Sequence, residues 1–369
     1  MKAVIVAGKT LVEILREWQL LGLVLLLPLL FVGITAFMYP GSLLVTYPVL
    51  VISPDTQETP LVAELRAQHY TDGRPIFDLT LTADRQAADA ALKEQKVTAL
   101  VILSPGGSGA TLVGDALYNR FYRASTILNG VISRYADRAA GRPEVVRVVE
   151  QPLAAAGPET EFDVYAPGMM IFAWLMIIPQ TAMLVAREIR RKTLRRLRLA
   201  SLRAWELLGG ISLSQMAVAV AQVVLVFVAA LAMGFHNRGS LGLATVVGLA
   251  ISFSSIGLGL LVACFSENDS QAANIGGTFA MLQVFLSGAF YPMPALTVFT
   301  LAGHPIGLFD VLPATHGFLA LQQVLCYGAG LRDVAFRLGA TVVLSLLYFV
   351  AGVAVFQYLQ MRGKRRRIT

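Results

Sequence analysis

The stretch REIRRKTLRRLRLASLRAWELLGG, residues 187–210, carries eight Arg and Lys side chains in a chain in which only 14% of the residues are charged. Four explanations compete for this concentration of positive charge. The four candidates are a nucleic-acid-binding patch, a lipid-binding patch, a topological anchor beside a membrane, and a docking surface for another protein. The composition of the rest of the chain separates them.

Long apolar runs dominate the 369 residues, of which 56% are hydrophobic. An α-helix needs about 20 apolar residues to cross a bilayer. Runs that meet this need are residues 19–39, 164–186, 207–235, 239–266, 270–309, 311–331 and 338–361. The sequence therefore predicts an integral membrane protein, and because no small-residue cleavage site follows the first run, we expect no cleaved signal peptide.

Residues 1–18 predict an amphipathic helix before the first apolar run. Leu11, Ile14, Leu15 and Trp18 recur at helical spacing, and the charged residues fall on other faces. We expect this helix to lie on the membrane surface. The alternative is a helix packed against the protein itself.

Positive charge predicts the topology, because short segments rich in Lys and Arg stay on the cytoplasmic side. Residues 187–203 and 362–367 are two such segments, so an even number of crossings must separate them. Four apolar runs supply these crossings, and residues 292–331 must then cross twice or not at all. Because this region contains Pro292, Pro294, Pro305 and Pro313, we expect an outer re-entrant helical hairpin that lines a cavity.

The predicted fold is a mainly α membrane protein with six transmembrane helices, an outer re-entrant helical hairpin and an extracytoplasmic α/β domain between spans one and two. Its expected parts are an interfacial helix (1–18), a first transmembrane helix (19–39), the α/β domain (40–165), a five-helix transmembrane domain (166–361) and a basic cytoplasmic tail (362–369). Residues 40–165 carry 11 basic and 15 acidic side chains, whereas the rest carry 19 and 8. Both termini are therefore expected in the cytoplasm.

The α/β domain is predicted from β-branched runs that alternate with helical stretches. The expected strands are residues 47–52, 76–81 and 97–103, and the expected helices between them are residues 60–69 and 83–96. This β-α-β-α-β order predicts a mostly parallel sheet. A helix near residues 117–140 and a strand near residues 144–150 would lead back to the membrane.

No catalytic or metal site is expected in this chain. SPGGSG, residues 104–109, does not match the phosphate-binding GxxxxGK[ST] pattern, in which the Lys meets phosphates and the hydroxyl meets magnesium, so we interpret it as a turn. The four histidines do not have metal-ligand spacing, and His304 and His316 are expected to face the re-entrant cavity. Since the apolar runs used as spans contain no Asp or Glu in their interiors, an ion-coupled carrier is disfavoured.

Polar and polarizable side chains inside the spans are candidates for a substrate path. Buried amides bond neighbouring helices or contact a substrate, and Met and aromatic side chains adapt to varied ligands. Helix packing explains such residues equally well. The candidates are Met170, Trp174, Gln180, Met281, Phe285 and Phe290.

The basic segment combines charge with an apolar stripe. Nucleic acid is disfavoured, because a short loop between two spans leaves little room for it. An anchor and contact with membrane lipids explain the charge. They do not explain Leu194, Leu197, Trp205 and Leu208, which recur at roughly helical spacing and predict a short helix across the inner face of the membrane.

Two motifs resemble those of ABC type-2 exporter permeases. E-x-x-x-x-T-L-R-R-L from Glu188 to Leu197, followed by RAWELLGG, resembles the loop between the second and third spans of that family. FLSGAFYPMPAL, residues 285–296, and LPATHGFLALQQVL, residues 312–325, resemble its fifth span and outer hairpin. This chain departs from the pattern with Lys192 in place of the usual Gly and with no Pro in the turn at residues 200–202.

The resemblance implies a permease subunit that exports amphipathic or hydrophobic substrates across a bacterial inner membrane. A separate ABC ATPase subunit would bind ATP and magnesium, and a second permease copy would complete the transporter; no cofactor is expected in this chain. The loop at residues 187–208 would dock on the ATPase through Glu188, Thr193, Leu194, Arg195, Leu197, Arg198 and Trp205.

The large extracytoplasmic domain resembles that of multidrug-type exporters, in which such a domain can meet a periplasmic adaptor protein. The alternative function is a non-transporting membrane receptor or scaffold that presents this domain. A channel or ion-coupled carrier is the third candidate.

Overall fold

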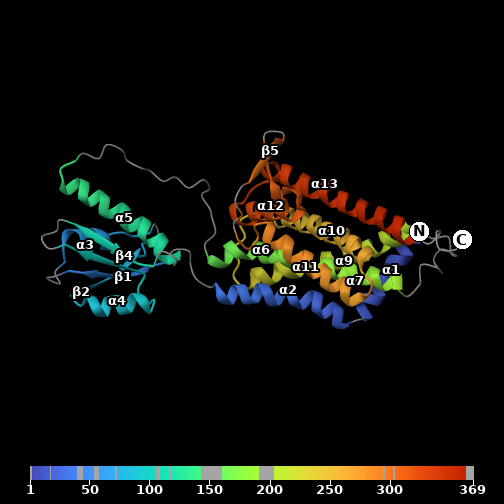
Figure 1. The fold of residues 1–369 in the computed structure, drawn as a ribbon, viewed down its shortest axis with the longest axis horizontal. Coiled ribbons are helices and arrows are strands. Elements are labelled where there is room, and N and C mark those ends of the chain that lie inside the picture. The colour runs from blue at the N-terminus through green and yellow to red at the C-terminus, as the bar shows by residue number, and fades with distance from the viewer. Residues whose placement is uncertain are drawn as a thin grey trace. The chain divides into compact units, whose positions relative to one another are not determined.

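The computed structural model divides the chain into two compact units, Met1–Gly41 with Ala154–Thr369, and Ser42–Leu153. We call them the helical unit and the α/β unit (Figure 1). The structure describes residues 2–16, 18–39, 45–53, 58–70, 73–104, 109–115, 119–142, 160–190, 203–291, 293, 296–301 and 304–362.

The α/β unit contains a four-stranded sheet with the order β2-β1-β3-β4. Its strands are β1 (Tyr47–Ile52), β2 (Phe77–Thr82), β3 (Ala99–Leu103) and β4 (Ala110–Val113). β1 pairs in parallel with β2 and β3, which confirms the three predicted strands and their parallel pairing. β4, antiparallel to β3, was not predicted, because four residues are too few to show alternation. The predicted strand at residues 144–150 lies outside the described residues.

Helices cover both faces of this sheet (Figure 1). α3 (Pro60–Arg66) and α5 (Asn119–Ala139) pack on the face that carries Val49, Val51 and Val101. α4 (Arg85–Lys93) packs on the other face. The predicted helices are confirmed in this unit, and side-chain oxygens of Thr59 and Asp84 cap the first turns of α3 and α4.

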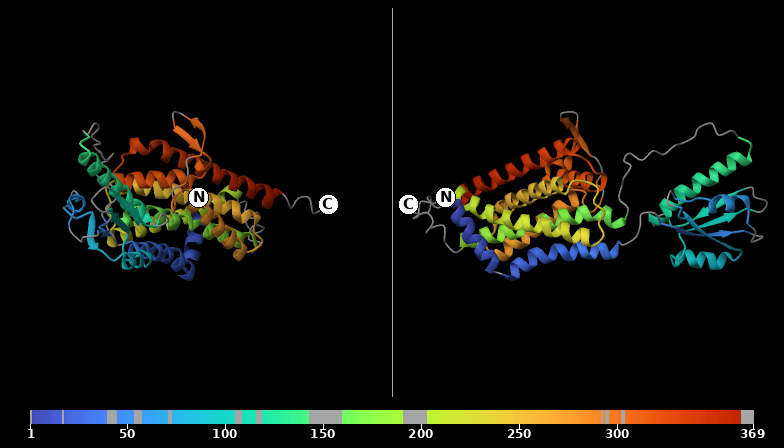
Figure 2. Two further views of the ribbon diagram at one scale, coloured as in Figure 1. Left: turned by 60° about the vertical axis from the view of Figure 1, so that its left-hand side comes forward. Right: turned by 180° about the vertical axis from the view of Figure 1, so that it is seen from behind.

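The helical unit is a bundle of helices that run side by side, with α1 at one end (Figures 1 and 2). Its helices are α1 (Lys2–Arg16), α2 (Trp18–Met38), α6 (Glu161–Leu175), α7 (Ile177–Arg190), α9 (Ala204–Ala232), α10 (Leu241–Phe265), α11 (Asp269–Leu286), α12 (Pro313–Tyr327) and α13 (Leu331–Phe356). A π-helical turn, η3 (Gln357–Arg362), follows α13.

Within the described ranges, 4 helices are long and apolar enough to cross a membrane: Glu161–Arg190, Ala204–Ala232, Leu241–Phe265 and Leu331–Leu359. These coincide with four of the six predicted spans. α2 and α11 form at the predicted first and fifth spans, but they are not among the four. The structure thus supports a membrane protein that is mainly helical, and six crossings stay a prediction.

α10 packs unusually close to its neighbours at two glycines. A Cβ on Gly257 would lie 2.7 Å from the backbone nitrogen of Phe349 in α13. A Cβ on Gly259 would lie 2.7 Å from Cβ of Thr181 in α7. Lipid is as apolar as a Leu side chain, so helices in a membrane gain their packing energy from such close approach.

The second predicted span is broken between α6 and α7 at Met176. Pro179 has no N–H to donate to the carbonyl four residues earlier, which explains the break. α9 holds both sides of it: Nε2 of Gln222 donates to the Ala173 carbonyl at 3.0 Å, and Nε2 of Gln215 donates to Oγ1 of Thr181 at 3.3 Å. Both glutamines are fully buried, as expected of amides that bond between helices.

The prediction of a helical hairpin at residues 292–331 was wrong in its first arm. β5 (Thr297–Leu301) and β6 (His304–Gly307) form an antiparallel ribbon, followed by a 3₁₀ turn, η2 (Leu308–Val311), and then α12. The prolines indicate only that a helix is interrupted. TVFT at residues 297–300 favours a strand, and Pro305 is tolerated in a ribbon whose edges are open. Pro313 then begins α12 at a position that suits proline.

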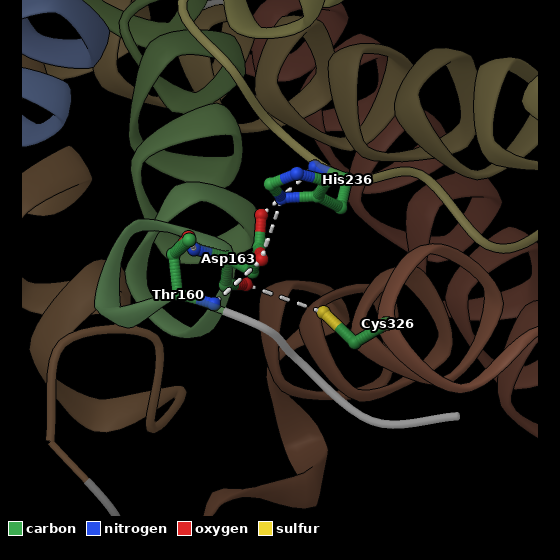
Figure 3. Close-up of polar contacts among 4 residues, drawn as sticks. All are labelled: Thr160, Asp163, His236 and Cys326. Atoms are coloured by element: carbon green, nitrogen blue, oxygen red, sulfur yellow. Dashed lines mark hydrogen bonds and ion pairs between the residues drawn. The ribbon is translucent and has the colours of Figure 1, made fainter. Parts of the chain in front are cut away.

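Asp163 joins three segments that are distant in sequence (Figure 3). It is 1% exposed, and it forms a capping box with Thr160 at the start of α6. Its Oδ1 accepts a hydrogen bond from the backbone N–H of His236 at 2.9 Å, and Nδ1 of His236 lies 3.2 Å from Oδ2. Sγ of Cys326 in α12 donates to its carbonyl at 3.3 Å. The start of α6, the α9–α10 connection and α12 therefore meet at one carboxylate residue.

α1 packs against α9 along one side. A Cβ on Gly210 would lie 2.6 Å from Cβ of Val6, and Ala7, Thr10 and Ile14 are buried. A second apolar strip on α1 is exposed and consists of Val4, Ile5, Val12 and Leu15. The predicted amphipathic helix is confirmed. It packs on the protein, as the alternative proposed, and it also keeps an apolar strip of the kind that a membrane surface accepts.

Gly257→Leu should destabilise the helical unit, because its side chain would overlap the backbone of α13. We expect a loss of about 1–3 kcal/mol or more, read as a lower melting temperature in detergent. Gly339→Leu, where a Cβ would meet nothing within 4 Å, is the matched control and should leave the melting temperature unchanged. Equal melting temperatures for both variants would show that the close contact is not needed.

Asp163→Asn should also lower stability, because an amide presents a donor where the carboxylate accepts hydrogen bonds from backbone N–H groups. We expect about 1–3 kcal/mol. Asp333→Asn is the control, since Asp333 occupies the same helix position in α13 and accepts from Gly330 N–H at 2.9 Å, but is exposed. Thermal melting of the two variants side by side tests this, and an equal effect would contradict a special role for burial.

Candidate coupling site and cavity

Two ends of the helical unit carry the candidate sites. We call the end at which α1 packs the α1 end, and the end with β5 and β6 the hairpin end. α7 reaches the α1 end at Arg190, and α9 leaves it at Ala204. Thr193, Leu194, Arg195, Leu197 and Arg198 of the predicted coupling loop lie outside the described residues.

Glu188 lies just before that undescribed segment and is held by α1. Nζ of Lys9 is 3.3 Å from Oε1 of Glu188 and 3.6 Å from Oε1 of Glu13. The Glu188 side chain is 14% exposed, so this ion pair is better shielded than an ordinary surface pair. A predicted coupling residue therefore connects α7 with α1.

Two arginines of α7 share one carboxylate of α11. Nε of Arg187 lies 3.3 Å, and a terminal guanidinium nitrogen of Arg190 lies 3.1 Å, from Oδ2 of Asp269. Asp269 begins α11, where Asn268 caps the helix, so the helix dipole favours its charge. The last turn of α7 is thus tied to the first turn of α11. Sequence reasoning missed this contact, because 79 residues separate Arg190 from Asp269.

The chain after the undescribed segment begins α9 at the α1 end. Oε2 of Glu206 accepts a hydrogen bond from the backbone N–H of Arg203 at 2.8 Å, which closes the first turn. Leu207 and Leu208 are buried, whereas Trp205 is 57% exposed. Trp205 and Leu208 therefore do not form one exposed stripe, and among the described residues of the first turn of α9 Trp205 is the exposed apolar side chain.

A cavity of about 570 Å³ lies at the hairpin end. Residues from the start of α6, the end of α11, the hairpin, η2, α12 and α13 line it. Asp310 orders this wall: its Oδ2 accepts from the Gly307 N–H at 2.7 Å, and its carbonyl lies 2.9 Å from Nε2 of His316. Since a carbonyl only accepts, Nε2 of His316 carries the proton. His316 faces the cavity as predicted, whereas the side chain of His304 is not among those that the structure describes.

The six candidate substrate-path residues separate into two groups. Phe290 lines the cavity, and the ring of Phe285 lies 5.6 Å from it in an edge-to-face contact. Met281 and Phe285 are each 44% exposed on α11. Met170, Trp174 and Gln180 are buried in the bundle and are not part of the cavity wall.

Arg337 is a cavity residue that sequence reasoning missed. It lies near the start of α13, directly before the last apolar run, residues 338–361. A search for uncharged runs therefore did not include it. Its position at the border of a predicted span could have indicated a functional residue, because ionisable side chains beside or within spans often have a function. Among the described residues, no cluster of three or more His, Cys, Asp or Glu side chains could hold a metal ion.

Comparison with known proteins gives the family. Residues 18–354 match the family described as ABC-2 family transporter protein. The chain is also 24% identical over 207 residues to ABC transporter G family member 20 from Dictyostelium discoideum, a match that covers 55% of this chain and 28% of that relative's length. Because the family match spans most of the chain, and the structure shows several apolar helices of membrane-spanning length, this protein belongs to the ABC-2 transporter family as its membrane component.

Proposed function

We propose that this chain is the permease subunit of an exporter that moves amphipathic or hydrophobic substrates out of the cytoplasm or inner leaflet. ABC-2 permeases work with an ATPase partner. Residues 1–369 contain no GxxxxGK[ST] loop, and we propose that the ATPase is a separate subunit. ATP and magnesium would be bound there.

The observation that carries the proposal is the ionic contact between α7 and α11 beside the predicted coupling loop, residues 187–208. Arg187 and Arg190 hold Asp269, so a push on the loop would reach α11 directly. α11 ends at Leu286, next to the cavity wall at Ser287 and Phe290. An ATPase that closes on the loop would in this way shift a helix that ends at the cavity, a movement of the shear kind.

A second permease copy is supported by the exposed face of α11. Asn274 and Thr278 are exposed there, beside Met281, Leu282 and Phe285. A polar amide that faces lipid is costly, so this face suits a protein neighbour or a wet substrate path between two copies. We propose a homodimer or a related heterodimer that meets along α11.

The remaining parts of the proposal concern location. The basic segments at residues 187–203 and 362–367 favour a cytoplasmic α1 end in a bacterial inner membrane, with both termini on that side. The α/β unit would then lie outside the cytoplasm, where a periplasmic adaptor protein could meet it. The exposed apolar strip of α1 would rest on membrane lipids.

The double variant Arg195→Glu with Arg198→Glu should lower substrate-stimulated ATPase activity of the assembled transporter and leave membrane insertion intact. The reason is that reversed charge would disturb docking on the ATPase. Arg123→Glu with Arg134→Glu, on the exposed side of α5, makes the same charge change elsewhere and should have no effect. Normal transport by the loop variant would refute the coupling role. A purified chain that neither captures an ATPase nor transports would favour the receptor or scaffold alternative.

Asp269→Asn should uncouple transport from ATP hydrolysis, because it removes the carboxylate that ties α7 to α11. We expect transport per ATP hydrolysed to fall about fivefold or more, the size of a typical coupling energy, with basal ATPase activity retained. Glu58→Gln is the matched control, because Glu58 pairs with Arg66 at 3.0 Å on the exposed surface of the other unit. Transport and hydrolysis are measured together in proteoliposomes. An unchanged ratio would show that α7 and α11 do not move as one.

A further inference from the structure

The cavity at the hairpin end has the dimensions of a ligand site. Its volume of about 570 Å³ falls within the range of roughly 300–1,000 Å³ that small-molecule pockets occupy. It is formed within one copy of the chain, by residues of the helical unit only. Its existence therefore does not depend on a dimer or on an ATPase.

Arg337 supplies a cation to this cavity. It stands six residues after Leu331, about 9 Å along the axis of α13, between the charged first turn of this helix and its long apolar part. Its side chain is half-buried and lines the cavity. The guanidinium makes no hydrogen bond or ion pair with any residue in the described part of the chain. A half-buried guanidinium with no hydrogen-bonded anion leaves its donors unused within the protein, which points to a partner that arrives from outside.

Asp310, the other charged residue of the cavity wall, attracts Arg337 electrostatically but forms no direct ion pair with it. No nitrogen of Arg337 lies within 4.0 Å of its carboxylate. Oδ2 of Asp310 instead accepts from the Gly307 N–H, and its carbonyl is paired with His316. Asp310 is therefore engaged in ordering the hairpin.

The rest of the wall is largely aromatic and aliphatic. Phe290 comes from the segment after α11, and Phe318 and Leu319 come from α12; together they offer apolar surface. A guanidinium binds carboxylate and phosphate groups through two parallel hydrogen bonds. The cavity thus combines a guanidinium that can bind an anionic group with apolar side chains that can contact the rest of a ligand.

We propose that this cavity binds a small amphipathic anion, with its carboxylate, phosphate or sulfonate on Arg337 and its apolar body against Phe290 and Phe318. The ligand is a free organic acid or the acidic headgroup of a lipid, which share this chemistry. Binding belongs to the single chain, so it holds whether or not the proposed export function is correct.

The test uses the full chain in nanodiscs of phosphatidylcholine, without an ATPase, and isothermal titration calorimetry with three matched probes. These are 2-naphthylacetate, its neutral amide, and the cation 2-naphthylethylamine; empty nanodiscs correct for partitioning. We expect the acid to bind at least about tenfold more tightly than the amide, the gain of one charge-assisted pair. Equal affinities for acid and amide, or a preference for the amine, would overturn the proposal without any mutation.

Two variants locate the binding. Arg337→Gln should lower the affinity for the acid about tenfold and leave that for the amide unchanged, while Arg332→Gln, on the exposed side of the same helix, should change neither. Leu319→Trp should weaken binding of both by filling the cavity. Unaltered binding by Arg337→Gln would refute the site.

Nanodiscs that contain phosphatidylglycerol distinguish the two sources of the anion. Competition with 2-naphthylacetate assigns the site to an acidic lipid headgroup, and absence of competition assigns it to a soluble acid.

Discussion

The helical unit depends on the close approach of α10 to α7 and α13. In a bilayer, an apolar side chain gains no hydrophobic free energy by moving from lipid into the protein, because both surroundings are apolar. The helices must therefore gain van der Waals energy from close packing. Gly257 and Gly259 make this packing possible, because without side chains they let the α10 backbone approach the backbone of α13 and the Thr181 side chain of α7. The direction of α7 follows from it, because Thr181 packs directly on Gly259. Everything that α7 presents at the α1 end, including Glu188 and the two arginines that bind Asp269, is positioned from this contact.

Polar side chains in the bundle lie where the backbone is interrupted. Gln222 bonds the Ala173 carbonyl next to the break between α6 and α7, and Asp163 bonds the backbone of His236 where α9 passes to α10. Backbone groups freed at such points need partners when water is absent. α11 differs, because it runs from Asp269 to Leu286 without a proline. Its length of about 27 Å separates the ionic contact with α7 from the cavity, which makes it the element best suited to carry a displacement between them.

Local patterns predicted the elements well and their interruptions poorly. The β-branched runs at residues 47–52, 76–81 and 97–103 became the parallel strands. β1 and β3 lie inside the sheet and read as nearly continuous apolar runs, whereas β2 lies at its edge and alternates buried with exposed side chains. The Thr160 to Asp163 spacing of a capping box was present in the sequence, yet the burial of Asp163 depends on His236 and Cys326, which no local pattern relates to it. A cavity beside the hairpin was expected, but most of its wall could not be derived from the sequence, because the wall comes from six separate segments. The prolines at residues 292–313 correctly indicated an interrupted helix. The strand that forms there instead was not predicted, although TVFT at residues 297–300 favours one.

The ribbon of β5 and β6 restricts where the hairpin end can lie. A two-stranded ribbon has two open edges, and unpaired N–H and C=O groups are not tolerated against hydrocarbon. A helical hairpin would have satisfied its own backbone and could have entered the bilayer, whereas this ribbon, with Val298 and Phe299 exposed, must meet water or another protein. This favours a position of the hairpin end at a membrane surface over one within the hydrocarbon. A charged side chain such as Arg337 costs less free energy near a membrane surface than within the hydrocarbon. The same position would open the cavity to a ligand that carries an anionic group.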